Sequence, residues 1–278
     1  MKLDILDYSV HGNEADTESD ALLKAASEAL GYTTRIVLLQ SEKHVPELQE
    51  RVWLRYDLRS RRELAWIVSV AENLEKKGHQ VFPSARSILL SEDKWETHLA
   101  LLHTRLPLIE THDLSATDPG GATIVLKPRV GWGGMGMKLL ENGADVLSQL
   151  LEEKKEYIWQ PFIPHRQTWT VVMAGKSLLS ILEKRATSND FRTNFHFGEE
   201  ALEASDPGGA GDRAALALDA VGLVAGGVDL IEADGQLKVL EVNSAPCLWY
   251  DNLPALDLAG PMVHCVMEWM DRFKEESI

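Results

Sequence analysis

Three oxygen-bearing side chains lie near one another in the last quarter of the chain, within a pair of apolar runs. Asp229 belongs to the first run, and Glu241 and Asn243 belong to the second, where a spacing of two places both on one face of a strand. Burying such groups is costly unless a cation compensates them, and Mg²⁺ binds one or two carboxylates together with substrate phosphates. The trio predicts a magnesium site, although taken alone it fits a half-exposed hairpin with carboxylates in water equally well.

Two lysines and a glycine-rich stretch could bind phosphate. Lys94 lies in the first turn of an expected helix, where the helix dipole disfavours a cation without a partner, and Lys127 ends an apolar run. Residues 131–137, Gly-Trp-Gly-Gly-Met-Gly-Met, let backbone N–H groups approach a ligand closely. They match neither the Walker pattern nor a dinucleotide fingerprint, so we interpret them as a flap between two strands, with a plain surface hairpin as the alternative.

Turn and capping residues near these groups predict the strands and the helix that carry them. The metal trio falls on a hairpin over residues 227–243 that turns at Asp234-Gly235, a dipeptide typical of tight hairpins. The flap follows a strand over 123–128. Lys94 falls in a helix expected over 92–104 with Ser91 as its N-cap.

The N-terminal third predicts a βαβ start. Strands over 3–6 and 34–39 flank a helix over 17–30 that ends at a glycine. A capping box formed by Ser60 and Glu63 begins the next helix. Further strands are expected over 51–55, 137–140, 157–160, 168–174 and 177–183, and further helices over 61–77, 144–155, 212–223 and 258–274.

Composition narrows the class of partner. The 278 residues carry a formal charge of −15, which argues against general nucleic-acid binding and against an anionic membrane surface. The two cysteines suggest neither a disulfide framework nor a metal site, and they fit a reducing compartment. The N-terminus lacks an apolar signal segment and no run is long enough to span a bilayer, so we expect a cytoplasmic protein.

Together, cations, a glycine flap and an oxygen-ligand hairpin describe binding of a nucleoside triphosphate with Mg²⁺. In this order they resemble the ATP-grasp superfamily, and most closely the RimK-like amino-acid ligases. The resemblance covers the chain from about Trp53 onward. Its most specific parts are LKPRVGWGGMGM, ILEKRATSNDFRTNFHFG and GGVDLIEADGQLKVLEVNSAP.

The resemblance implies an α+β, ATP-grasp fold with three subdomains, which we expect at residues 1–88, 89–161 and 162–278, and with ATP between the central and C-terminal ones. It implies catalytic roles, at the γ-phosphate or the acyl-phosphate intermediate, for Arg185, Arg192 and Asn194. Asp229, Glu241 and Asn243 would bind Mg²⁺, with Mn²⁺ as a substitute. The implied ATP contacts are Lys94, Lys127, Gly133, Gly134 and Gly136, with Gln160, Pro161, Phe162 and Ile163 around adenine.

The sequence departs from this family pattern in three places. Pro161 stands where a Glu is usual, and Thr168-Trp169-Thr170 replaces an Asp-x-Arg, leaving His165 or Arg166 as the nearby candidates to replace the cation. Residues 245–250 replace a small Pro-Gly loop. Because these changes lie where substrate would be selected, they leave the acceptor open.

The expected activity is an ATP-dependent carboxylate–amine ligase that adds an amino acid such as glutamate to a small molecule or peptide. Two alternatives remain open, a small-molecule kinase on the same fold and a nucleotide-binding protein without ligase activity. The expected partners are a carboxylate and an amine, with neither nucleic acid nor membrane. The sequence leaves the oligomeric state open, a homo-oligomer included.

Overall fold

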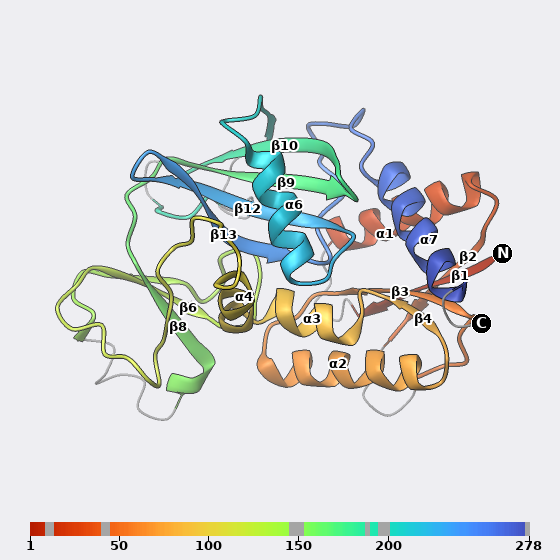
Figure 1. Ribbon diagram of the computed structural model, residues 1–278, viewed down its shortest axis with the longest axis horizontal. Coiled ribbons are helices and arrows are strands. Elements are labelled where there is room, and N and C mark those ends of the chain that lie inside the picture. Colours follow the sequence, from red (N-terminus) through yellow and green to blue (C-terminus); the bar gives the residue numbers. More distant parts are fainter. Residues whose placement is uncertain (9–13, 40–44, 145–152, 187–189, 194–200, 276–278) are drawn as a thin grey trace.

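Three β-sheets and the helices between them make up the described part of the protein (Figure 1). The computed structural model describes residues 1–8, 14–39, 45–144, 153–186, 190–193 and 201–275. Within these residues helices and strands are mixed along the chain, which confirms the expected α+β class.

The N-terminal sheet is parallel, with strand order β2-β1-β3-β4. Successive side chains of β1 point to opposite faces of this sheet and pack in two different hydrophobic cores. Leu3 and Ile5 pack in one core with α1 and the C-terminal helix α7 (Ala259–Glu275), whereas Leu6 packs on the other face against α2. The predicted βαβ start is therefore confirmed. The elements are β1 (Lys2–Tyr8), α1 (Glu14–Ala29), β2 (Thr33–Leu38), β3 (Arg51–Tyr56), α2 (Arg61–Lys76) and β4 (Gln80–Phe82).

The helix expected over 92–104 is wrong: two short helices, α3 (Ala85–Glu92) and α4 (Lys94–Leu101), meet at Asp93. Asp93 has an extended backbone, and its carboxylate accepts the N–H groups of Trp95 and Glu96, so it is the N-cap of α4. Ser91 instead donates its hydroxyl to the Ser87 carbonyl, 2.8 Å away within α3. By contrast, the Ser60 cap of α2 is confirmed.

The central sheet is antiparallel, with order β5-β8-β6-β7 and a small core of its own that includes Ile124 and Trp159. Its strand β8, the last of the four along the chain, ends at Pro161, as predicted. The helix expected over 144–155 falls largely outside the described residues. The elements are β5 (His112–Asp113), β6 (Ile124–Pro128), β7 (Lys138–Leu140), the 3₁₀ turn η1 (Lys154–Glu156) and β8 (Tyr157–Pro161).

The C-terminal sheet is antiparallel, with order β11-β10-β9-β12-β13, and α6 packs on one face of it. The hairpin predicted over 227–243 is confirmed, and Asp234 and Gly235 turn it with positive φ angles of 54° and 71°. The elements are β9 (Gln167–Ala174), β10 (Ser177–Arg185), β11 (Leu202–Glu203), α6 (Ala210–Ala220), β12 (Ala225–Ala233), β13 (Gln236–Asn243) and α7 (Ala259–Glu275).

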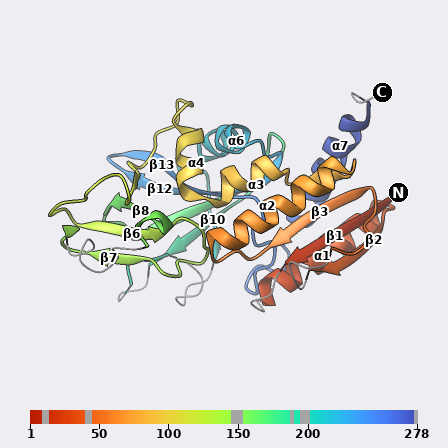
Figure 2. The ribbon, with the colours of Figure 1, turned by 90° about the horizontal axis from the view of Figure 1, so that it is seen from below.

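The chain returns to its start, because α7 packs beside α1 and the N-terminal sheet (Figures 1 and 2). Arg51 pairs with Asp271 on α7, and Gln80 donates to the Met270 carbonyl at 2.7 Å. The boundaries expected at 88/89 and 161/162 stay a prediction. None of the described helices combines the length and apolar character needed to cross a membrane.

Candidate active site

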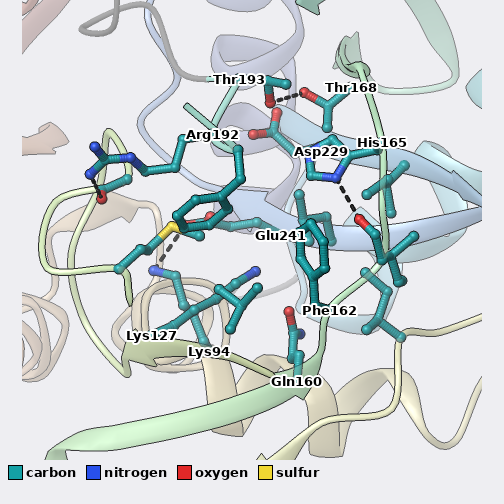
Figure 3. A pocket seen from close by; sticks show the side chains of 18 of the residues that line it. Lys94, Lys127, Gln160, Phe162, His165, Thr168, Arg192, Thr193, Asp229 and Glu241 are labelled. Atoms are coloured by element: carbon teal, nitrogen blue, oxygen red, sulfur yellow. Dashed lines mark hydrogen bonds and ion pairs between the residues drawn. The ribbon is translucent and has the colours of Figure 1, made fainter. Parts of the chain in front are cut away.

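A cavity of about 70 Å³ lies between the central and C-terminal sheets, under the glycine flap (Figure 3). The flap is residues 131–137. Among the described residues, four predicted site residues do not line this cavity: Gly133, Gly136, Arg185 and Asn243. Asn194 lies outside the described residues. The predicted residues that do line it are Lys94, Lys127, Gly134, Gln160, Pro161, Phe162, Ile163, Arg192, Asp229 and Glu241.

Lys94 connects the hairpin of β12 and β13 to the flap. As the first residue of α4 it reaches the Glu241 carboxylate at 3.1 Å and donates to the Gly131 carbonyl at 2.6 Å. Lys127, at the end of β6, is buried beside them, and this burial lowers its pKa to about 8, with the nearby Lys94 charge acting in the same direction. Lys127 is therefore a buried cation that an anionic ligand would stabilise.

Asp229 is held by two neighbours on the same sheet face. The Thr170 hydroxyl donates to one carboxylate oxygen at 2.6 Å, and the Lys184 ammonium lies 3.1 Å from the other. The strand register explains this, since Asp229 pairs with Thr170 across β9 and with Glu241 across β13. The two carboxylates thus project from adjacent strands into one cavity (Figure 3). Each has a lysine as its partner.

The flap leaves β6 and turns back to β7. Gly133, Gly134 and Gly136 all have positive φ, between 63° and 72°, which explains why glycine is used at these positions. A Cβ added at Gly136 would lie 2.8 Å from the ring of Pro128, so the flap also approaches its own strand closely there. Gly134 lines the cavity and accepts a hydrogen bond from Arg192 at 3.2 Å.

The connector after β8 forms another wall of the cavity. The Phe162 N–H is already bonded to the Thr123 carbonyl at 3.0 Å, and the buried Gln160 side chain donates to Thr111. The Ile163 carbonyl accepts from His165 Nδ1 at 2.7 Å. Burial lowers the pKa of His165 despite this bond, so a neutral imidazole that donates from Nδ1 presents its Nε2 as an acceptor.

The two arginines predicted to act together are placed differently. Arg192 lines the cavity and is held by Asp190, whose carboxylate lies 2.6 Å from Nη2. Arg185 is exposed on β10 and pairs with Glu183 at 2.6 Å. Because successive residues of a strand point to opposite faces, the neighbouring Lys184 faces the cavity instead.

Three cavity-lining polar residues were not predicted as site residues: Lys184, Thr168 and Thr193. The Thr168 and Thr193 hydroxyls are 2.6 Å apart and buried. Lys184 lies two residues after Leu182, on the strand face opposite Arg185, and only the pairing of β10 with β9 shows that this face meets the cavity. Thr168 was noted only as part of the replacement for the family's Asp-x-Arg, and Thr193, which lies outside any strand, carried no signal.

The residues present fit a hard divalent cation that is shared with a bound phosphate. Asp229 and Glu241 are oxygen donors on paired strand positions, which suits Mg²⁺. Within the described part of the chain no group of three or more His, Cys, Asp or Glu could hold a metal by itself. Two carboxylates alone leave coordination to be completed by substrate oxygens or water. The part of Asn243 in such a site stays a prediction.

A family model described as the RimK-like ATP-grasp domain matches residues 107–266. A probable alpha-L-glutamate ligase from Haemophilus ducreyi is 28% identical over 196 residues, which cover 66% of this chain and 64% of that protein. The ribosomal protein bS6–L-glutamate ligase of Shigella boydii is 29% identical over 160 residues, or 55% of this chain and 52% of that protein. The chain thus spans less than two thirds of each relative.

Among solved structures, the D-alanine–D-alanine ligase of Bacillus anthracis complexed with ATP has a similar fold. Its TM-score is 0.71, and the superposition covers 100% of both chains at 15% sequence identity. At that identity the similarity is informative about the arrangement of the elements and says nothing of substrate.

Proposed function

Because the chain belongs to the RimK-like ATP-grasp family, we propose that it is an ATP-dependent carboxylate–amine ligase that forms an amide through an acyl phosphate. The observation that supports this activity most directly is a single cavity in which lysines from three elements face two carboxylates on paired strands. Cations for phosphate and oxygens for a divalent metal are the two components that phosphoryl transfer from ATP requires.

In this proposal ATP lies between the two sheets with its phosphates under the flap. Lys94, Lys127 and Lys184 bind phosphate oxygens, and the connector from Gln160 to Ile163 borders adenine. Asp229 and Glu241 hold Mg²⁺, which supplies positive charge against the transferring phosphoryl group when bound. Arg192, already oriented by Asp190, lies on the flap side of the cavity and stabilises negative charge on the γ-phosphate.

The chemistry has two steps. A substrate carboxylate oxygen attacks the γ-phosphorus, the bond to the β–γ bridging oxygen breaks, and ADP leaves. An amine then attacks the carbonyl carbon of the acyl phosphate, inorganic phosphate leaves with the former carboxylate oxygen, and the amine nitrogen loses a proton. The flap excludes water from the acyl phosphate between these steps, because hydrolysis would waste the intermediate.

The proposed amine is an amino acid such as glutamate, and the proposed acceptor is a carboxylate on a small molecule or a peptide. The names of the two relatives, both glutamate ligases, support the first point, and the ribosomal-protein acceptor of one supports a peptide. The acceptor wall of this chain has its own chemistry. Thr168 lines the cavity where the family pattern has an acid, and its hydroxyl is bonded to that of Thr193, so recognition there relies on neutral hydroxyls. Thr170, at the arginine position, instead donates its hydroxyl to Asp229.

An ADP-release assay tests the proposal. The purified chain is incubated with ATP, Mg²⁺ and a panel of carboxylates, with and without amino acids, and products are identified by mass spectrometry. Release of ADP that requires the amine, together with an amide product, supports the ligase. A phosphorylated product formed without amine identifies a kinase, and the absence of ADP with every substrate identifies a binding protein.

Glu241→Gln is the sharpest variant for this assay. It keeps the side-chain shape but removes the charge that Mg²⁺ and Lys94 use, so turnover should fall by about 100-fold or more. Glu232→Gln, an exposed position on the same hairpin, is the matched control and should retain wild-type turnover. Undiminished turnover of Glu241→Gln at limiting Mg²⁺ would exclude Glu241 from the metal site.

A further inference from the structure

The flap contains one large aromatic side chain, Trp132, and it bonds outside the central sheet. Its indole N–H donates to the carboxylate of Asp57, which directly follows β3 of the N-terminal sheet and is buried. The Arg59 guanidinium lies 5.6 Å from the centre of the Trp132 ring and 3.3 Å from the Asp57 carboxylate. This contact restrains the flap, so the flap is more than a flexible glycine-rich loop.

The two residues that precede Trp132 are anchored too. Val130 packs in the core of the N-terminal sheet with Leu58, and the Gly131 carbonyl accepts from Lys94. Beyond Trp132 the flap has fewer attachments, and Met135 and Gly136 are exposed. The first half of the flap is therefore fixed to the N-terminal subdomain, and the second half contains the glycines that allow it to bend.

The flap must move for a nucleotide to pass. The cavity of about 70 Å³ is well below the roughly 300–1,000 Å³ typical of pockets for small ligands. Lys94 and Arg192, which both face the cavity, are bonded to flap carbonyls at Gly131 and Gly134. The structure thus holds the flap down over the cavity, and Trp132 provides the hydrogen bond that attaches this position to another subdomain.

The end of β3 also holds the loop that follows the metal hairpin. Arg55 donates to the Pro246 carbonyl at 3.1 Å, and the Tyr56 hydroxyl lies 2.5 Å from that of Ser244. Three successive residues, Arg55, Tyr56 and Asp57, therefore bind the metal-side loop and the flap. Their position on one strand end links the two sides of the cavity through the N-terminal sheet.

We propose that Trp132 and Asp57 are positioning residues that latch the flap closed on the N-terminal subdomain and so slow nucleotide release. The latch deepens the proposed function and rests on it, because a closed flap protects an acyl phosphate from water only while it stays closed. Neither residue performs chemistry. Both act by fixing where the first half of the flap lies relative to the phosphates.

Trp132→Phe tests the latch, because it keeps an aromatic ring beside Arg59 and removes the N–H donor together with the pyrrole part of the indole. Release of a fluorescent methylanthraniloyl-ADP in the presence of Mg²⁺ is measured by stopped-flow fluorescence. We expect it to be about tenfold faster than in wild type, because a hydrogen bond to a carboxylate is among the stronger kinds. The amides of Met135 and Met137, which bond to flap carbonyls, should exchange hydrogen faster without nucleotide. Trp66→Phe, at a half-buried tryptophan that packs on Tyr8, is the matched control.

The outcomes separate the latch from the proposed function. Asp57→Asn should speed release in the same direction, and the double variant should be less affected than the product of the single effects, because both changes weaken one contact. Release and flap exchange equal to those of wild type in Trp132→Phe would overturn the latch, whether or not the chain ligates. If wild type fails to bind the ADP analogue, the nucleotide part of the proposed function falls, and flap exchange still decides the latch.

Discussion

At the scale of single residues, the cavity pairs each of the carboxylates of Asp229 and Glu241 with a lysine. Lys184 and Asp229 are both nearly buried, with side-chain exposures of 8% and 11%. The Thr170 hydroxyl donates a hydrogen bond to the other oxygen of the Asp229 carboxylate. A buried pair of this kind gives little net stability, but removal of one partner leaves an uncompensated charge. Under the proposed function, the same lysine neutralises Asp229 in this structure and becomes available to phosphate when Mg²⁺ takes its place.

Lys184→Met should expose this exchange. The free energy of unfolding should fall by about 3 kcal/mol at neutral pH, because Asp229 loses its counter-charge. Millimolar Mg²⁺ should restore part of this loss in the variant and change wild type less, since the divalent cation then compensates Asp229. Urea denaturation with and without Mg²⁺ measures both effects.

The neighbouring Arg185→Met is the control, because its exposed pair with Glu183 should contribute less than about 1 kcal/mol. A loss of stability in Lys184→Met that Mg²⁺ leaves unchanged would contradict the exchange.

At the scale of elements, the sequence predicted the pieces that carry local signals. The Asp234-Gly235 turn and the Ser60 cap specify their hairpin and helix within a few residues, and both are confirmed. The break at Asp93 was missed because α3 and α4 are separated by one residue, and Asp93 is held by a contact distant in sequence, a 2.9 Å bond from Arg129. Such tertiary contacts leave no periodic trace in the sequence.

The site residues divide in the same way, into those with a local signal in the sequence and those placed by tertiary contacts. Lys127, Asp229 and Glu241 could be predicted because charged residues interrupt apolar strands, which is a strong signal. Which of two adjacent basic residues on β10 enters the cavity depends on the register of β10 against β9. The register pairs Lys184 with Thr168 and turns Arg185 outward, and a single sequence does not reveal it.

The flap gives the element-scale prediction. Gly136 combines a φ of +71° with a close approach to Pro128, whereas Gly120, in the turn before β6, has a φ of +57° and open space around its Cα. Alanine at either position should cost about 1 kcal/mol of stability from backbone strain. Only Gly136→Ala should also displace the flap, so its affinity for ATP should fall by about tenfold while Gly120→Ala keeps wild-type affinity. Calorimetric titration with ATP distinguishes the two, and equal affinities would show that the Pro128 contact does not set the flap position.

At the scale of the whole molecule, the first and last thirds of the chain form one packed unit. Leu3 and Trp53 share a core with Val263 and Met267 of α7. The chain as a whole is acidic, with a net charge of −15, yet the cavity collects lysines from α4, β6 and β10 and an arginine beside the flap. Attraction of an anionic nucleotide is therefore a local property of the cavity, set by how the sheets meet.

Substitution of Arg55 tests how the N-terminal and C-terminal parts of this packed unit are held together. Arg55 is buried, it donates to Asp20 of α1 at 3.1 Å, and it also donates to the Pro246 carbonyl after the metal hairpin. Burial raises the pKa of Asp20 to about 6, above the ordinary value of 3.8, although Arg55 opposes the shift and the nearby Asp7 and Asp16 add to it. Since the folded state binds the proton more tightly than the unfolded chain, the charged form of Asp20 disfavours folding above this pKa, and that cost is relieved as pH falls toward 4.

Arg55→Met should therefore be costly in a pH-dependent way. At about pH 7.5 it leaves the buried Asp20 carboxylate without its cation, and we expect a loss of about 3 kcal/mol in the free energy of unfolding. At about pH 5 Asp20 is protonated in the folded variant, so the loss should shrink to about 1 kcal/mol, the contribution of the remaining hydrogen bond to Pro246 and of the 4.0 Å ion pair with Asp16. Urea denaturation at the two pH values measures the difference, with the exposed Arg86→Met as a control expected to change stability by less than about 0.5 kcal/mol at both. A loss that is equal at the two pH values, or greater at the lower one, would show that Arg55 does not act by compensating Asp20.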